Sequence, residues 1–146
     1  MAELHPQLQK DCLLLGRFPL CRLLLMHDAN YPWFILVPDR EAVSEIFQLS
    51  EEDQIQLLRE SALLSVVLVE RFHADKLNIA ALGNVVPQLH VHHVARYRQD
   101  PAWPAPVWGR VPNRPYTPEG LSAVLDTLRP GLPDNFEFSD KIFTTT

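Results

Sequence analysis

The apolar positions of the chain fall into short runs and periodic stretches, separated by segments of turn-forming residues. Two apolar runs, Cys21 to Met26 and Trp33 to Val37, flank a segment that contains Asp, Asn and Pro. Short apolar runs bounded by turn residues are typical of strands, and a short connection favours antiparallel pairing. The segments Leu77 to Leu82 and Gln88 to Tyr97, joined by Gly83 to Pro87, show the same arrangement. The pattern therefore predicts an antiparallel sheet of at least four strands.

Helical periodicity is strongest between Ser50 and Phe72. Ser50 is a favourable N-cap residue, and the acidic residues that follow it suit the positive end of a helix dipole. One face of this predicted helix carries apolar residues at helical spacing: Ile55, Leu58, Ala62, Val66 and Val69. We therefore expect a long amphipathic helix over these residues.

Weaker patterns predict the remaining elements. Short helices are expected at Leu8 to Leu14, at Glu41 to Leu49 and at Glu119 to Leu128. The segment Phe136 to Ser139 alternates like a strand. Together with the predicted sheet, these elements indicate an α+β fold, in which helices pack mainly on one face of an antiparallel sheet.

Length and composition favour a single domain. A chain of 146 residues with 47% hydrophobic and 21% charged residues fits one domain with a buried core. We assign residues 1–146 to that domain, with a core at about 20–109 and a C-terminal extension over 98–146. Prolines crowd the first part of this extension, so an extended arm carrying Trp103 and Trp108 is expected there.

The charge and the cysteine content argue against several function classes. A net charge of −5 without a basic patch makes nucleic acid and membrane surfaces unexpected partners. Cys12 and Cys21 lack the spacing of a metal-binding pair and are expected to be reduced thiols. The N-terminal residues do not resemble a secretory signal, and no apolar run is long enough to span a bilayer. We therefore expect a cytoplasmic protein.

Three of the six histidines fall within one predicted strand. Because side chains alternate between faces, Gln88, His90 and His92 should share one face, while His93 points to the other. Same-face neighbours lie roughly 6.5 to 7 Å apart, so one phosphate group could contact both His90 and His92. A single histidine is most often a surface residue, but this concentration favours a site. We expect His93 to pack under the helices or to form a hydrogen bond there.

The segment Gln88-Leu89-His90-Val91-His92-His93-Val94 resembles the motif of the histidine triad (HIT) family, His-φ-His-φ-His-φ-φ with φ apolar. The order of elements from about residue 20 to 109 is also similar to that family. The resemblance implies a HIT-like fold and a nucleotide-binding enzyme. Such an enzyme cleaves a phosphoanhydride or a phosphoramidate of a nucleoside monophosphate.

The resemblance also assigns catalytic roles to the motif. His90, at the central position, would form a covalent nucleotidyl intermediate that water hydrolyses, or that passes the nucleotide to another acceptor. A neutral imidazole is a suitable nucleophile near pH 7. His92 would supply a proton or a charge-assisted hydrogen bond to the leaving group. Gln88 stands where the pattern has its first histidine, and it can donate and accept hydrogen bonds but cannot titrate.

Three further residues are candidates for nucleotide binding. In the resembling pattern the loop after the first strand meets the ribose, which nominates His27 and Asp28, and Asn84 would contact phosphate. Asp28 and Asn84 are equally compatible with ordinary turn roles.

The expected partners follow from the same resemblance. They are a nucleotide-like small-molecule substrate, such as a diadenosine polyphosphate or a nucleoside phosphoramidate, and a second copy of the chain in a homodimer. Trp103 and Trp108 would close the pocket, contact that second copy or pack in a small core of their own. The chemistry calls for no metal or other cofactor.

Two other functions fit the same residues. His90 and His92 could share a zinc ion if His27 or a carboxylate supplied a third ligand. Alternatively, Gln88 could mark a non-catalytic nucleotide-binding or regulatory module that has lost hydrolysis. Metal analysis distinguishes the first alternative, and a search for a covalent adduct distinguishes the second.

Overall fold

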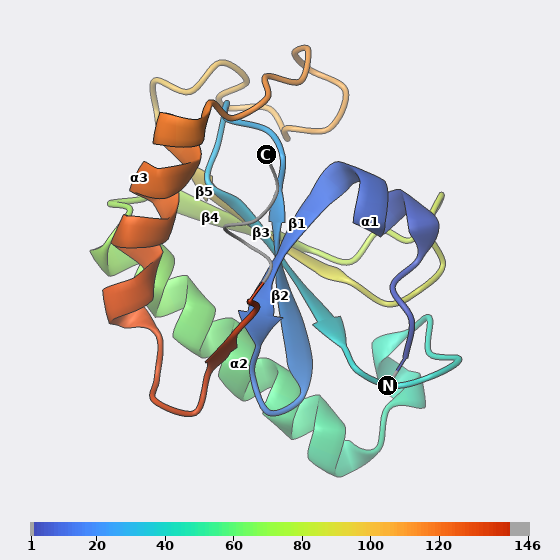
Figure 1. Cartoon of the computed structure of the whole chain (residues 1–146). Helices are drawn as coiled ribbons and strands as arrows, with labels where there is room; N and C mark the ends of the chain where they lie inside the picture. The colour runs from blue at the N-terminus through green and yellow to red at the C-terminus, as the bar shows by residue number, and fades with distance from the viewer. Residues whose placement is uncertain (1, 141–146) are drawn as a thin grey trace.

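The computed structural model describes residues 2–140, which contain a six-stranded antiparallel sheet in the order β4-β5-β3-β2-β1-β6. Its strands are β1 (Cys12–Arg17), β2 (Cys21–Met26), β3 (Trp33–Pro38), β4 (Lys76–Ala80), β5 (Val91–Arg96) and β6 (Glu137–Phe138). The helices are α1 (Pro6–Asp11), α2 (Glu51–Glu70) and α3 (Pro118–Leu128), with the 3-10 turns η1 (Ile46–Gln48) and η2 (Arg129–Gly131). Figure 1 shows α2 in green and α3 in orange on one side of the strands, and α1 in blue on the other. The predicted α+β fold with helices mainly on one face is confirmed.

The two faces of the sheet bury separate cores. On the face under α2 and α3, residues such as Phe34 and Leu36 of β3 pack against Leu64 and Leu68 of α2. On the other face, alternate residues of β3 pack with α1 and with the segment that follows β5: Leu8, Trp33, Ile35, Val37, Val94, Ala102 and Val107. The strand β5 therefore separates a helix-covered face from a face covered mainly by irregular chain.

The strands at the centre of the sheet lie close to their predicted positions, but the first half of β1 lies within the helix predicted at Leu8 to Leu14. Residues Leu8 to Leu14 form a helix only as far as Asp11, and the chain then continues as β1. Antiparallel pairing of β1 with β2 satisfies the backbone groups that a helix would have paired internally. Gly16 lets the terminal strand β6 approach, because a Cβ at this position would collide with the carbonyl oxygen of Glu137.

The helix predicted at Glu41 to Leu49 is wrong except for the short turn η1. The carbonyl of Val43 accepts a hydrogen bond from the Leu89 N–H, which ties this segment to the chain just before β5. The side-chain oxygen of Gln48 accepts the backbone N–H groups of Ser44 and Glu45. These contacts take groups that a helix would have used in its own ladder.

Helix α2 begins after Ser50, as predicted, and Ser50 Oγ accepts the Asp53 N–H at 3.1 Å. The buried face of the helix was predicted wrongly, because its buried residues are Leu57, Glu60, Leu64, Val67 and Leu68. The predicted apolar face points to solvent instead: Ile55, Leu58, Ala62, Val66 and Val69. Helix α2 has apolar residues on two faces, so periodicity alone could not decide which face the sheet covers.

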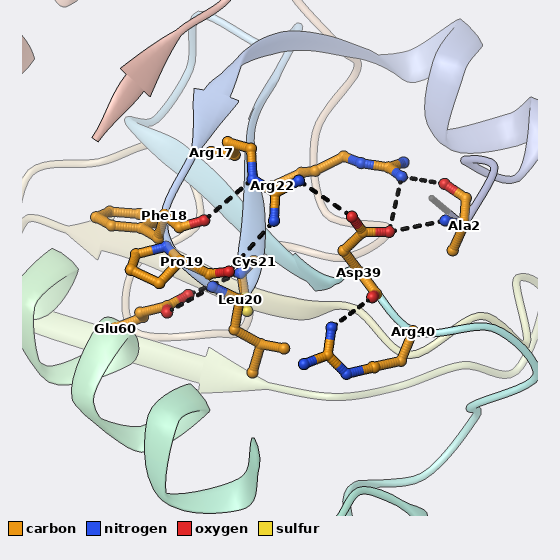
Figure 2. Close-up of polar contacts among 10 residues, drawn as sticks. All are labelled: Ala2, Arg17, Phe18, Pro19, Leu20, Cys21, Arg22, Asp39, Arg40 and Glu60. Carbon is orange, nitrogen blue, oxygen red and sulfur yellow. Dashed lines mark hydrogen bonds and ion pairs between the residues drawn. The ribbon is translucent and has the colours of Figure 1, made fainter. Parts of the chain in front are cut away.

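The N-terminal segment is fastened to the sheet through Asp39, at the end of β3 (Figure 2). Its carboxylate accepts the Ala2 N–H at 2.7 Å and receives one guanidinium each from Arg17 of β1 and Arg22 of β2, both at 3.1 Å. Burial by itself raises the pKa of Asp39, but these donors outweigh it and hold the pKa below its ordinary value. The first residues of the chain are therefore fixed beside the sheet.

A second buried carboxylate connects α2 to the turn between β1 and β2. Glu60 accepts the backbone N–H groups of Leu20 and Cys21 at 3.0 and 2.8 Å, as Figure 2 shows. Gln56 donates a further hydrogen bond to Glu60 at 2.6 Å. Glu60 is thus part of the buried face of α2 because its oxygens pair with backbone donors that would otherwise be unsatisfied.

Over residues 2–140, no helix is long and apolar enough to cross a membrane.

Candidate functional site

His90 lies immediately before β5 and is buried. Its Nδ1 is 2.7 Å from the backbone carbonyl oxygen of Gln88. A carbonyl oxygen can only accept, so Nδ1 carries the ring proton and Nε2 carries the lone pair of the neutral imidazole. The backbone thus fixes the tautomer in which Nε2 is available as a nucleophile.

His92 has the opposite arrangement. Trp33 Nε1 of β3 donates a hydrogen bond to His92 Nδ1 at 3.0 Å. An indole N–H can only donate, so His92 Nδ1 is the acceptor and Nε2 carries the proton. Burial, with smaller contributions from His90 and His93, lowers the pKa of His92 to about 3. His92 is therefore a neutral N–H donor near neutral pH.

The two imidazoles lie together at one cavity. Their ring centroids are 4.9 Å apart, and both rings line a cavity of about 600 Å³. Within residues 2–140, the Nε2 atoms of His90 and His92 form no hydrogen bond, and neither is sealed from solvent. The cavity thus presents one nucleophilic lone pair and one hydrogen-bond donor to a ligand.

Gln88 is the predicted catalytic residue whose side chain lies apart from this cavity. Its amide accepts the His5 N–H at 2.8 Å and donates to the Glu3 carbonyl at 3.0 Å. It lines a separate hollow of about 780 Å³ beside the N-terminal segment. Gln88 reaches the site through its backbone carbonyl, which orients His90, while its side chain holds the N-terminal segment.

His27 and Asp28 line a second cavity of about 450 Å³. Asp11, Met26, Trp33 and Trp108 line both this cavity and the one at the histidines, so the two hollows adjoin.

Asp28 is buried. The hydrogen bonds that its carboxylate accepts within residues 2–140 all go to Oδ1, from the backbone and side chain of Asn30 and from the Arg114 N–H. Its second oxygen is not sealed from solvent. Asp28 therefore combines the predicted turn role with an acceptor that remains available.

Asn84 lies on the wall of the histidine cavity that the chain between β4 and β5 supplies. Residues 82–86 all contribute to this wall, and Gly83 adopts a positive φ of 74° that allows the turn. Asn84 and Val85 are exposed, and Val85 is 83% exposed. The structure brings Asn84 to the same cavity as His90 and His92.

The two arm tryptophans have different surroundings. Trp108 lines both cavities, and its ring centroid is 5.3 Å from His92 and 5.7 Å from Trp33. Trp103 instead lies against the guanidinium of the buried Arg96, at 5.7 Å. Trp108 belongs to the site, whereas Trp103 contacts a structural arginine.

Trp33 and Asp11 are site residues that the sequence analysis did not identify. Trp33 pairs with Val94 across the sheet, so it lies diagonally opposite His92 on the same face. Asp11 lies at the end of α1, and it accepts a hydrogen bond from Gln7 at 2.8 Å. The register between β3 and β5 was the missing information, because it places Trp33 beside His92.

The expectation for His93 is confirmed. Its side chain is fully buried on the helix face of the sheet, where Nε2 is 2.7 Å from Ser61 Oγ of α2 and Nδ1 is 3.0 Å from the Val91 carbonyl. Burial lowers the pKa of His93 to about 4, although the Val91 carbonyl acts in the opposite direction. His93 therefore connects β5 to α2 behind the site.

Few charged groups line the two cavities: Lys10, Asp11 and Asp28. The structure groups no three His, Cys, Asp or Glu side chains in positions suited to a metal ion anywhere in residues 2–140. A ligand at the histidines would therefore meet mainly imidazole, indole and apolar groups, with Asp11 and Asn84 as further polar residues of the same wall.

Comparison with known proteins agrees with this arrangement. A model of the HIT domain matches residues 7–99, which include both histidines of the cavity. The chain belongs to the HIT family.

Solved structures of HIT proteins resemble this one closely. A histidine triad protein from Marinobacter aquaeolei is 51% identical, with a TM-score of 0.86 over 89% of this chain and 95% of its own. One from Bradyrhizobium japonicum is 45% identical, with a TM-score of 0.86 over 88% and 96%. A more distant protein from Sulfolobus tokodaii, at 15% identity and a TM-score of 0.62 over 82% and 83%, shares the fold. No curated protein matches the sequence.

Proposed function

We propose that this HIT-family chain is a nucleotide-binding hydrolase or nucleotidyl transferase that works through a covalent nucleotidyl-His90 intermediate. The observation that carries the proposal is the hydrogen bond from His90 Nδ1 to the Gln88 carbonyl. This bond leaves the Nε2 lone pair available in a cavity that His92 also lines. A neutral, oriented imidazole is the form that attacks phosphorus.

The reaction has two steps. In the first, His90 Nε2 forms a bond to the phosphorus of the nucleoside monophosphate group, and the bond from phosphorus to the leaving group breaks. In the second, water attacks the phosphorus, the N–P bond breaks, and the water proton passes to solvent. His92, as a neutral Nε2–H donor, stabilises negative charge that develops on oxygen during both steps.

The nucleoside would occupy the adjoining cavity. Asp28 has an oxygen available to accept ribose hydroxyl groups, and His27 lies beside it. Asn84, which lines the histidine cavity, would contact the phosphate. Trp108 lies between the two cavities, so it would contact the ligand where phosphate joins nucleoside.

Intact-protein mass spectrometry tests the proposal. After brief mixing with diadenosine tetraphosphate or an AMP phosphoramidate, and a quench without acid, the protein should gain the mass of one AMP. His90→Ala should abolish the gain and leave nucleotide binding within roughly tenfold, because it removes a group needed only in the transition state.

His73→Asn is the matched control for this experiment. His73 is an exposed histidine whose φ of 58° suits asparagine, so the variant should keep the adduct. Equal adduct formation by His90→Ala and the unmodified protein would disprove the assignment. Binding of AMP with no adduct and no turnover would instead support a non-catalytic nucleotide-binding module.

We also propose that the protein acts as a homodimer. The exposed apolar residues of α2 form a stripe, hereafter the α2 stripe: Ile55, Leu58, Ala62, Val66 and Val69. Helix α2 contacts β4, the edge strand of the sheet, and Ile79 of β4 is 50% exposed on the face that α2 covers. An apolar stripe next to an unpaired strand edge can be covered by the same surface of a second copy.

A further inference from the structure

The hydrogen bond between Trp33 and His92 restricts which proton His92 can offer. Both side chains are buried, with exposed fractions of 6% and 5%. Trp33 Nε1 lies 3.0 Å from His92 Nδ1 and has no lone pair to accept with. A proton on His92 Nδ1 would therefore point at the indole N–H of Trp33. Since the His92 imidazolium carries that proton, it would lose the hydrogen bond from Trp33.

We propose that Trp33 is a positioning residue that holds His92 as the neutral Nε2–H tautomer, so that the leaving group must depart as an anion. This inference rests on the proposed function and narrows its substrate class. It favours nucleoside monophosphates joined to their leaving group through a phosphoanhydride over those joined through a phosphoramidate.

The two kinds of leaving group differ in whether they need a proton when they depart. When a phosphoanhydride is cleaved, the His90 Nε2–P bond forms, the P–O bond breaks, and the oxygen keeps the electron pair as a phosphate anion. A phosphate whose second pKa is about 6 needs no added proton near pH 7. A hydrogen bond from His92 Nε2–H is therefore sufficient for this leaving group.

A phosphoramidate makes a different demand. Its P–N bond breaks to give an amine, which must receive a proton because an amine anion does not form in water. His92 cannot deliver one while Trp33 occupies Nδ1, because loss of its only proton would give an imidazolate. General acid assistance contributes about 10²–10⁴-fold to such steps, so its absence weighs heavily.

The other groups around the cavity do not replace this proton. The ring proton of His90 is used in the hydrogen bond to the Gln88 carbonyl. Asp11 of α1 lines the cavity, and its carboxylate accepts a hydrogen bond from Gln7. His93 lies on the other face of the sheet, bonded to Ser61. An amine leaving group would depend on water for its proton.

Nitrogen NMR of the unliganded protein tests the tautomer without any substrate. In ¹⁵N-labelled protein at pH 7, His92 should show an unprotonated Nδ1 and a protonated Nε2. Trp33→Phe keeps an aromatic ring and removes the donor, so His92 should become a mixture of tautomers. A protonated Nδ1 in the unmodified protein, or an unchanged tautomer in Trp33→Phe, would overturn the proposal.

Trp108→Phe is the matched control. Trp108 contacts the His92 ring at 5.3 Å and forms no hydrogen bond with it within residues 2–140, so this variant should leave the tautomer unchanged. The ¹H–¹⁵N backbone spectrum of each variant verifies that it is folded. A tautomer change in Trp108→Phe as large as in Trp33→Phe would mean that general packing, and not the indole donor, sets the proton.

The substrate preference is measured by kcat/KM on two matched compounds, diadenosine tetraphosphate and the phosphoramidate of AMP with a primary amine. The unmodified protein should favour the anhydride by at least about 100-fold. Trp33→Phe should shift the ratio several-fold towards the phosphoramidate, whereas Trp108→Phe should change both values together. A phosphoramidate cleaved as fast as the anhydride would overturn the inference while leaving the proposed function in place.

Failure of the proposed function has a different signature. If no adduct and no AMP release occur with either compound, the nucleotidyl transfer and its leaving-group preference are both disproved. The NMR experiment still decides whether Trp33 fixes the His92 tautomer in that case, because it uses no substrate.

Discussion

His90 and His92 lie two residues apart on one face, yet their hydrogen bonds protonate opposite ring nitrogens. His90 receives its orientation from its own backbone, and His92 receives it from a neighbouring strand. The same residue type thus supplies a nucleophile in one position and a neutral donor in the other. This division of roles depends on the partners Gln88 and Trp33, and the motif pattern by itself does not specify it.

Replacement of Gln88 distinguishes its backbone role from its side-chain role. Gln88→Ala removes two hydrogen bonds to the N-terminal segment, worth about 1 to 3 kcal/mol together, but keeps the carbonyl that orients His90. Urea denaturation should show this loss, while the rate of adduct formation falls by less than tenfold. Gln88→His can both donate and accept, so it should retain activity.

A larger effect in either variant would assign the side chain a direct part in the reaction. If Gln88→Ala abolished adduct formation while its folded structure and nucleotide binding were intact, the amide itself would be catalytic. His90→Ala sets the scale for complete loss in the same assay.

The buried histidines also predict how stability depends on pH. The pKa of His92 is about 3 and that of His93 about 4 in the folded chain, below the value of about 6.5 for an unfolded histidine. The unfolded chain therefore binds more protons, and stability is full above about pH 6.5 and is lost as pH falls towards 4. Each histidine contributes a slope of up to about 1.4 kcal/mol per pH unit in this range.

Denaturation by urea at several pH values between 7 and 5 measures this slope. His93→Gln should reduce it, whereas His73→Asn, which removes an exposed histidine, should leave it unchanged. A slope that is identical in His93→Gln and the unmodified protein would contradict the buried neutral state of His93.

At the scale of elements, β5 connects the helix layer on one face of the sheet to the histidine cavity on the other. His92 faces the cavity, and His93 on the reverse side is bonded to Ser61 of α2. Ser61→Ala leaves a buried ring nitrogen without its partner, which should cost about 1–3 kcal/mol. Thermal or urea denaturation measures this loss, and the adduct should still form.

Ser65→Ala is the control on the same helix. Among the described residues, Ser65 Oγ bonds only to the Ser61 carbonyl one turn earlier, so its loss should cost much less. Equal costs for the two variants would mean that the contact to His93 contributes nothing specific.

The elements also show which parts of the fold a sequence can predict. Strands β2 and β3 were predicted within one residue, because each is a continuous apolar run between turn residues. Residues 12–17 were assigned in part to a helix, because their leucines fit either period, and only pairing with β2 on one side and β6 on the other makes them a strand. Local preference was overridden by a tertiary partner.

The site residues that lie in a local motif were also predictable, whereas those placed by long-range contacts were not. His90 and His92 were identified from the motif segment and Asn84 from the family resemblance, and all three line the same cavity. The side-chain direction of Gln88 was not predictable, because its partners Glu3 and His5 are more than 80 positions away in the chain. Trp33 was missed for a similar reason, since its place beside His92 depends on strand register.

At the scale of the whole molecule, the residues proposed for catalysis and for nucleotide binding lie around two adjoining cavities, on the face of the sheet opposite α2. The α2 stripe lies on the helix layer, on the reverse side of the sheet from the histidine cavity. A homodimer formed through the α2 stripe would therefore cover apolar surface on the side of the sheet away from the cavities.

Replacement of a residue in the α2 stripe tests this separation. Leu58 is 70% exposed, so Leu58→Glu should leave the fold intact but place a charge in the proposed interface, and light scattering after size exclusion should show a shift from dimer to monomer. Phe47→Glu, at a 77% exposed position in η1 outside the stripe, should remain dimeric. A monomer for the unmodified protein would disprove the homodimer. Because the α2 stripe and the histidine cavity lie on opposite sides of the sheet, the Leu58→Glu monomer should form the AMP adduct at a rate similar to the dimer. Loss of the adduct only on dissociation would show that the second copy completes the site.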